Sequence, residues 1–142
     1  MRAQILSGDK PITLGVLSAI EEDDRATQRG ISQELGIALG LTNAYLKRCV
    51  KKGFVKVQHI PANRYAYYLT PTGFAEKSRL TADYLSMSFN FFRSSREQCA
   101  ALFGTCEKRR WTRVALAGCG DLAEIFTLCR REDSDVEIVG II

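Results

Sequence analysis

The residues from Leu35 to Ala75 constrain the fold most, because a change of periodicity and a one-sided charge coincide there. Apolar residues recur at helical spacing as far as Val50 and then alternate with polar ones over Phe54–Gln58, and a Tyr-rich stretch follows over Arg64–Leu69. This pattern predicts a helix followed by a two-stranded hairpin. The same window lacks Asp and Glu, although the chain has 16 of them, and it contains six basic residues: Lys47, Arg48, Lys51, Lys52, Lys56 and Arg64.

Two further helices are expected before this window. Residues 10–22 carry apolar side chains on one helical stripe, made by Ile12, Val16, Ala19 and Ile20. Thr27 suits the N-cap of a second helix, and Gly36 suits the end of that helix. Three helices and a hairpin predict a winged helix-turn-helix domain of the α+β class. The alternative is another small α+β domain with a helical hairpin.

The third helix, residues 39–52, has two different faces on a helical wheel. Its inner side is expected to hold Leu39, Thr42, Leu46, Cys49 and Val50, and its outer side Gly40, Leu41, Ala44, Lys47, Arg48 and Lys51. A helix that enters a DNA major groove needs small residues near the bases and cations beside the phosphates. Lys and Arg that neutralise phosphates supply most non-specific DNA affinity, which a nearby carboxylate opposes. The alternatives are a solvated basic face and a protein-interaction module.

Residues 10 to about 90 resemble MarR-type transcriptional regulators, and look closest to a subgroup associated with exopolysaccharide genes. The motifs that carry the resemblance are ELGI at 34–37, LKRCVKKGFVK at 46–56 and LTPTG at 69–73. The resemblance implies a homodimer that reads a palindromic operator in double-stranded DNA. It also implies DNA contacts from the second helix, the third helix and the wing: Thr27 and Gln28; Leu41, Asn43, Ala44, Tyr45, Lys47, Arg48 and Lys51; and His59, Asn63 and Arg64. One departure is Ala38, where a capping Ser or Thr is common.

A long helix is expected from Thr72 onward, with Thr72 as its cap. A seam of large apolar residues at heptad spacing predicts a dimer interface made by Leu80, Tyr84, Met87 and Phe91. The alternative is that this seam folds back on the winged helix of its own chain. Ser94 and Glu97 have the spacing of a capping box, which predicts a break and a fresh helix to about Lys108.

The last part of the chain has the pattern of a partial βαβ unit. RVALAG at 113–118 predicts a strand, the residues after it a helix, and DVEIVGII at 135–142 a second strand. Gly118, Gly120 and Ala123 occupy the glycine positions of a dinucleotide fingerprint, so the unit resembles the start of a Rossmann-like domain and, with a winged helix before it, a Rex-type redox sensor. Asp121 opposes this function, because a carboxylate at a helix N-terminus repels pyrophosphate. Two strands and one helix cannot bury their own apolar faces, so we expect a truncated unit or completion by a partner subunit.

Together these patterns predict three regions: a winged-helix DNA-binding domain at 1–71, a helical linker and dimerisation region at 72–109, and a partial βαβ Rossmann-like unit at 110–142. The predicted function is sequence-specific transcriptional regulation, and the alternative is a nucleotide or redox sensor. The five cysteines include no C-x-x-C pair and the chain has one His, which argues against a zinc site. We expect no cofactor, no catalysis, no membrane span and a cytoplasmic location.

Overall fold

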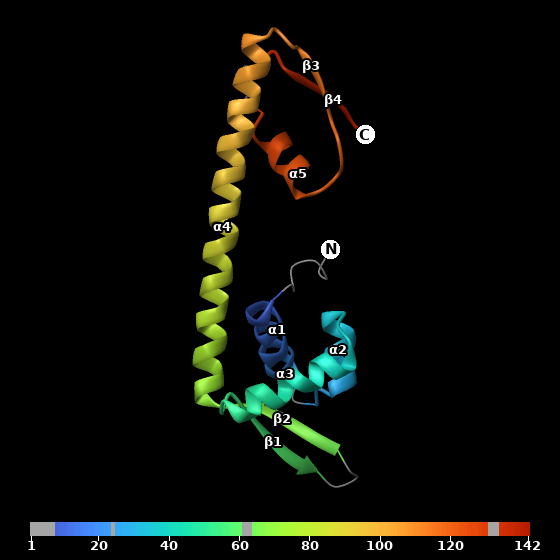
Figure 1. Cartoon of the computed structure of the whole chain (residues 1–142), viewed down its shortest axis with the longest axis vertical. Helices are drawn as coiled ribbons and strands as arrows, with labels where there is room; N and C mark the ends of the chain where they lie inside the picture. Colours follow the sequence, from blue (N-terminus) through green and yellow to red (C-terminus); the bar gives the residue numbers. More distant parts are fainter. Residues whose placement is uncertain (1–7, 24, 61–63, 131–133) are drawn as a thin grey trace. The chain divides into compact units, whose positions relative to one another are not determined.

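The computed structural model describes residues 8–23, 25–60, 64–130 and 134–142. Figure 1 shows the order of the elements along the chain. The helices are α1 (Asp9–Glu22), α2 (Gln28–Leu35), α3 (Leu39–Lys51), α4 (Pro71–Lys108) and α5 (Asp121–Leu128), and the strands are β1 (Val55–Ile60), β2 (Arg64–Leu69), β3 (Arg113–Leu116) and β4 (Glu137–Ile141). The chain divides into two units, Met1–Leu85 and Ser86–Ile142. We call them the N-terminal and the C-terminal unit and describe each by itself.

The first three helices of the N-terminal unit confirm the sequence prediction. All four residues of the predicted stripe on α1 are buried. Thr27 caps α2, since its hydroxyl oxygen accepts a hydrogen bond from the backbone N–H of Gly30 at 3.0 Å. Gly36 ends α2 in the left-handed conformation at φ 64°, which glycine adopts without a steric penalty. Caps at both ends therefore fix the length of this short helix.

The hairpin of β1 and β2 joins the core made by these helices (Figure 1). The strands pair antiparallel, from Val55 opposite Leu69 to Ile60 opposite Arg64. Val55 and Tyr67 are buried with Leu17, Ile31 and Leu46 of the helices, so one face of the hairpin is fixed to the helical layer. The connection between the strands at 61–63, which includes the predicted wing residue Asn63, lies outside the described residues.

The inner face of α3 differs from the prediction at its edges. Thr42, Tyr45, Leu46 and Cys49 are buried, whereas Leu39 is 44% and Val50 38% exposed. The buried face is therefore centred between Thr42 and Cys49 and includes Tyr45 at one edge. A tyrosine suits an edge position, because its ring packs in the core while its hydroxyl reaches a polar partner outside. Ala38 provides no side-chain cap, as expected, and the Thr42 hydroxyl donates to the Ala38 carbonyl at 3.3 Å.

The start of α4 also corrects the sequence analysis. Thr70, and not Thr72, caps the helix, since its hydroxyl oxygen accepts the Gly73 N–H at 3.0 Å and Pro71 occupies the first turn. Gly73 packs so closely on Phe54, the residue before β1, that a Cβ there would lie 2.0 Å from the Phe54 carbonyl oxygen. Leu80, predicted to lie in a dimer seam, is 4% exposed and packs in the core of the N-terminal unit. The fold-back alternative is therefore correct for this residue.

The predicted break at Ser94 is wrong, because α4 continues through it. Ser94 accepts a hydrogen bond from the Gln98 side chain at 3.3 Å, one turn further along the same helix. No Gly or Pro occurs from Phe74 to Phe103, so no residue in that stretch strongly disfavours the helix. A Ser–Glu spacing alone does not end a helix whose backbone hydrogen bonds can continue.

The C-terminal unit contains the predicted strand, helix and strand. β3 and β4 pair in parallel, with a register shift between Val114 and Ala115. Phe103 of α4 stacks on Phe126 of α5 at 4.4 Å between ring centroids, and Val136 is almost fully buried beside them. The βαβ connection is confirmed, while a Rossmann-like identity stays a prediction. Within the described residues, no helix has the length and apolar character to cross a bilayer.

Candidate nucleic-acid interface

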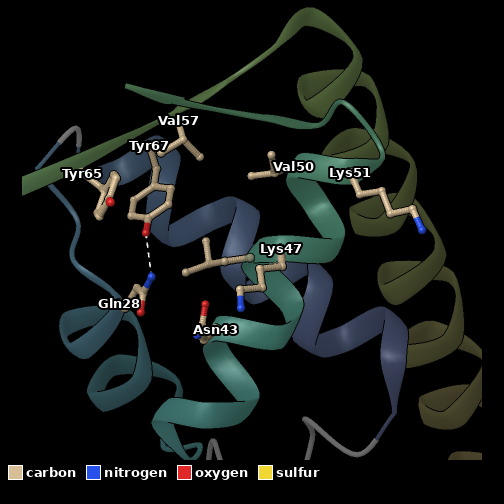
Figure 2. A pocket seen from close by; sticks show the side chains of 9 residues that line it. Gln28, Asn43, Lys47, Val50, Lys51, Val57, Tyr65 and Tyr67 are labelled. Atoms are coloured by element: carbon tan, nitrogen blue, oxygen red, sulfur yellow. Dashed lines mark hydrogen bonds between the residues drawn. The ribbon is translucent and has the colours of Figure 1, made fainter. Parts of the chain in front are cut away.

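A groove lies between α3, the start of α2 and the β1–β2 hairpin (Figure 2). Its cavity volume is about 510 Å³, and no acidic residue lines it. The lining residues are Gln28, Asn43, Leu46, Lys47, Val50, Lys51, Val57, Tyr65 and Tyr67. We call it the α3–hairpin groove. It brings together side chains from four elements, α2, α3, β1 and β2.

The start of α2 is tied to the hairpin across this groove. The Gln28 side chain donates a hydrogen bond through Nε2 to the Tyr67 hydroxyl at 2.9 Å, which Figure 2 shows as a dashed line. Thr27, the other residue expected to contact phosphate, uses its hydroxyl to cap the helix. Both residues therefore lie at the α2 N-terminus, where free backbone N–H groups favour an anion.

The outer face of α3 presents the predicted basic and small residues. Leu41, Ala44, Lys47 and Lys51 are exposed, and Asn43 is half-buried. Figure 2 shows Asn43 and Lys47 projecting from α3 on the side that faces Gln28. The Asn43 amide and the Lys47 ammonium group thus occur together in a groove whose lining is partly apolar. This combination can hydrogen-bond a base edge and neutralise a phosphate.

Arg48 and Tyr45 lie outside the groove, at the edge of α3 that faces α1. An Arg48 nitrogen lies 3.1 Å from a carboxylate oxygen of Asp9, and the guanidinium lies 4.8 Å from the centre of the Tyr45 ring. The Tyr45 hydroxyl donates to the same carboxylate. The hydrogen bonds from Tyr45 and Arg48 lower the pKa of Asp9, and the hydrogen bond to Asp9 raises the pKa of Tyr45. Tyr45, expected to enter or flank a DNA groove, is instead 5% exposed.

The hairpin supplies the remaining residues expected to contact DNA. His59 on β1 is exposed and meets Tyr65 of β2 edge-to-face at 5.5 Å between ring centroids. Lys56 is exposed on the same strand. Arg64 lies in β2 opposite Ile60, and its side chain is outside the described part of the chain.

Comparison with known families decides the class of this unit. Residues 9–56 match the family model described as winged helix-turn-helix DNA-binding. The match covers α1 to the start of β1, and the N-terminal unit has the winged helix-turn-helix fold. We refer to α3 as the recognition helix and to the β1–β2 hairpin as the wing, the names that these elements carry in that fold. No curated protein matches the sequence.

Solved structures have a similar fold over 69–78% of this chain. The PcaV transcriptional regulator of Streptomyces coelicolor has 22% identity and a TM-score of 0.55, over 69% of this chain and 74% of that one. The MarR family regulator SP03579 has 20% identity and a TM-score of 0.53, over 78% and 76%. MepR of Staphylococcus aureus, a regulator of the multidrug efflux pump MepA, has 20% identity and a TM-score of 0.50, over 75% and 82%.

At the predicted nucleotide site of the C-terminal unit, backbone groups of Gly118 and Gly120 already make hydrogen bonds within the protein. Gly118 has a φ of 93°, and its N–H donates to the carbonyl of Ile142 at 2.7 Å. Gly120 precedes α5, and its carbonyl accepts the N–H of Ala123 at 2.9 Å. Asp121 and Glu124 both lie in the first turn of α5, where their charges oppose an anion. The Rex-like alternative is not supported, and among the described residues no cluster of His, Cys, Asp and Glu could hold a metal ion.

Proposed function

We propose that this chain is a transcriptional regulator that binds operator DNA through α3 and the wing as a homodimer. The observation that carries the proposal is the acid-free groove between recognition helix and wing, in which Asn43, Lys47 and Lys51 line the α3 side at spacings of about one turn. The three solved structures compared above are named as transcriptional regulators, which adds support at the level of the fold. A cytoplasmic location and the absence of catalysis belong to the same proposal.

The residues divide into phosphate contacts and base contacts. Lys47 and Lys51 neutralise phosphates, and the α2 N-terminus with Thr27 and Gln28 binds a further phosphate. Asn43 reads a base edge, and its amide matches adenine, which offers one donor and one acceptor in the major groove. Leu41 and Ala44 make apolar contacts beside it, for example with a thymine methyl group. His59, Asn63 and Arg64 are proposed to contact DNA from the wing.

The dimer is proposed to form through the exposed apolar residues of α4. Tyr84, Met87 and Phe91 are 37%, 64% and 52% exposed, and Phe89 and Phe92 expose further aromatic surface between residues 84 and 92. So many exposed aromatics in one segment are typical of an interface. Two winged-helix domains on one face of a duplex place their half-sites about one helical turn apart, roughly 34–36 Å.

We also propose that the protein controls exopolysaccharide genes, because its sequence resembles the regulator subgroup associated with such genes. It rests on the ELGI, LKRCVKKGFVK and LTPTG motifs alone. The reading frames beside the gene test it: genes for exopolysaccharide synthesis there would support this extension, and their absence would count against it. A βαβ unit that is Rossmann-like also remains a proposal, supported by the parallel pairing of β3 and β4.

Fluorescence anisotropy with a duplex selected by the protein from a random pool tests the DNA-binding function. Lys47→Ala and Lys51→Ala should each reduce the slope of log affinity against log salt by about 1. Asn43→Ala should lower affinity for the selected duplex by about 1–3 kcal/mol and leave binding to random DNA almost unchanged. Lys108→Ala is the matched control, since Lys108 is exposed and lies outside the groove. An equal loss in the control, or no binding to any duplex at low salt, contradicts the proposal.

A further inference from the structure

A second cavity lies within the C-terminal unit, between α4 and the end of α5. Its volume is about 640 Å³, and side chains of α4 and of residues 128–130 line it. Among the described residues, it shares none with the lining of the α3–hairpin groove. Cavities that hold small molecules measure roughly 300–1,000 Å³, so this one has room for a ligand. The DNA-binding function proposed above does not use it.

Two opposite charges lie at opposite ends of the α4 wall of this cavity. Arg96 and Glu107 both line it, and both are exposed. They are 11 residues apart (107 minus 96). That is about three helical turns, so the two residues share one face of α4 and are separated by about 16 Å along its axis. Among the ion pairs of the described residues, none includes Arg96 or Glu107.

The carboxylate of Glu107 is held in position by the chain before β4. The Ser134 hydroxyl donates a hydrogen bond to Glu107 Oε1 at 3.0 Å, and the Val136 N–H donates to the Ser134 hydroxyl oxygen at 3.4 Å. Val136 is buried beside Phe103, which fixes this short chain of hydrogen bonds to the core of the unit. The negative end of the cavity is therefore oriented before any ligand binds.

The wall between the two charges is apolar. Ala100, Phe103 and Gly104 line it from α4, and Leu128, which is 75% exposed, lines it from the end of α5. A Cβ at Gly104 would meet no described atom within 4 Å. Glycine stabilises a helix less than alanine does, and the described neighbours leave room for a larger side chain. The missing side chain of Gly104 thus keeps open a space that an apolar group can fill.

We propose that this cavity binds an elongated zwitterion, a molecule with a carboxylate at one end, an ammonium group at the other and an apolar body between them. The carboxylate pairs with the N–H groups of Arg96, and the ammonium group pairs with Glu107. The apolar body covers Gly104 and Leu128. An apolar anion that spans the cavity would meet the carboxylate of Glu107, and an apolar cation would meet Arg96, so neither satisfies both ends.

A short apolar peptide with free termini and a long ω-amino acid both have this chemistry. Four extended residues span about 13 Å, and the long side chains of Arg96 and Glu107 cover the remaining distance. Arg130, which also lines the cavity, adds a second cation.

Titration calorimetry of the whole chain tests the site with two probes, the tetrapeptide alanyl-leucyl-leucyl-alanine and ω-aminododecanoate. At least one free probe should bind, and acetylating its amine or amidating its carboxylate should each weaken binding by about tenfold, because one charge-assisted pair is lost. The two probes also distinguish the sources of the ligand. Tighter binding of the tetrapeptide assigns the site to peptides, and equal or tighter binding of ω-aminododecanoate assigns it to ω-amino acids.

Substitutions at the two ends should match the two blocked probes. Arg96→Gln and Glu107→Gln should each weaken binding of the free probe by about tenfold. Glu107→Gln should cause no further loss with the N-acetylated probe, and Arg96→Gln none with the C-amidated probe. Arg93→Gln and Glu97→Gln are the matched controls, since both residues are exposed on α4 outside the cavity lining, and neither should change the affinity.

Three results would overturn the proposal: no binding of either free probe to the native chain, equal binding of free and blocked probes, or an equal loss in the control variants. The free and blocked probes are compared on the native chain, so the test does not depend on how well a variant folds. It contains no DNA, so its outcome is separate from that of the DNA-binding experiment.

Discussion

The Tyr45 hydroxyl on the recognition helix donates a hydrogen bond to the carboxylate of Asp9 at the start of α1. Arg48, one turn further along α3, pairs with the same carboxylate oxygen at 3.1 Å. Asp9 therefore binds both Tyr45, which is buried in the core, and Arg48, which the sequence analysis predicts to contact DNA. The carboxylate of Asp9 at the N-terminus of α1 therefore offsets part of the positive charge of α3.

Asp9→Asn should release Arg48 and strengthen non-specific DNA binding. The substitution removes a negative charge beside the recognition helix and leaves Arg48 without its carboxylate partner. We expect a several-fold gain in affinity at low salt and a salt slope steeper by about 1. Anisotropy with random duplex over a salt series measures both values. Glu22→Gln, an exposed carboxylate at the other end of α1, is the control and should change neither. An unchanged salt slope for Asp9→Asn would show that Arg48 takes no part in binding DNA phosphates.

The Tyr45–Asp9 contact also predicts how stability depends on pH. The pKa of Asp9 is lowered from 3.8, so its contribution is present above 3.8 and is lost as the pH falls through the folded value. The pKa of Tyr45 is raised from 10.0, so its contribution is present below 10.0 and is lost as the pH rises through the folded value. Denaturant unfolding of the native chain and Tyr45→Phe across pH measures the difference. The difference in unfolding free energy between the native chain and Tyr45→Phe should become smaller at low and at high pH. A difference that stays constant across pH would count against the Tyr45–Asp9 hydrogen bond.

Gly73→Ala should destabilise the N-terminal unit strongly. The new Cβ would lie 2.0 Å from the carbonyl oxygen of Phe54, a backbone atom that cannot rotate away. We expect a loss of about 3 kcal/mol in the free energy of unfolding. Gly104→Ala on the same helix is the control, because its Cβ meets no atom within 4 Å. It should gain about 0.5–1 kcal/mol from helix propensity. Thermal and urea unfolding compare the two variants, and equal effects would refute the close packing of Gly73 on Phe54.

Met87→Glu should separate the proposed homodimer. Met87 is 64% exposed on the segment of α4 where aromatic residues gather, so a charge there would be buried without a partner in a dimer. Met87→Leu keeps the apolar volume and should leave the dimer intact. Sedimentation velocity of both variants gives the oligomeric state directly. A Met87→Glu protein that stays dimeric would place the interface elsewhere.

The sequence was sufficient where one local signal has one physical meaning. Thr27 and Gly36 mark the ends of α2, because a side-chain cap and a left-handed glycine each satisfy a helix end in a single way. The alternation after Phe54 likewise predicts the paired strands of the wing. The parallel pairing of β3 with β4 follows from a strand, a helix and a strand in succession.

The sequence was insufficient where tertiary packing chooses between equivalent positions. Tyr45 and Leu39 both border the inner face of α3, and the acceptor on Asp9 favours the tyrosine. Leu80 has the heptad spacing of a dimer seam, yet it packs in the core of its own unit. The stacking of Phe103 on Phe126 gave no signal in the sequence, since it depends on where α5 packs.

Lysine footprinting tests most directly whether DNA occupies the groove between α3 and the wing. The protein is acetylated briefly with and without a saturating selected duplex, and the modification of each lysine is quantified by mass spectrometry. The account predicts that the duplex protects Lys47 and Lys51 at least several-fold, with Lys56 on the wing also protected, while Lys108 reacts equally in both samples. Equal reactivity of Lys47 and Lys51 with and without DNA, under conditions where the duplex is bound, would contradict it.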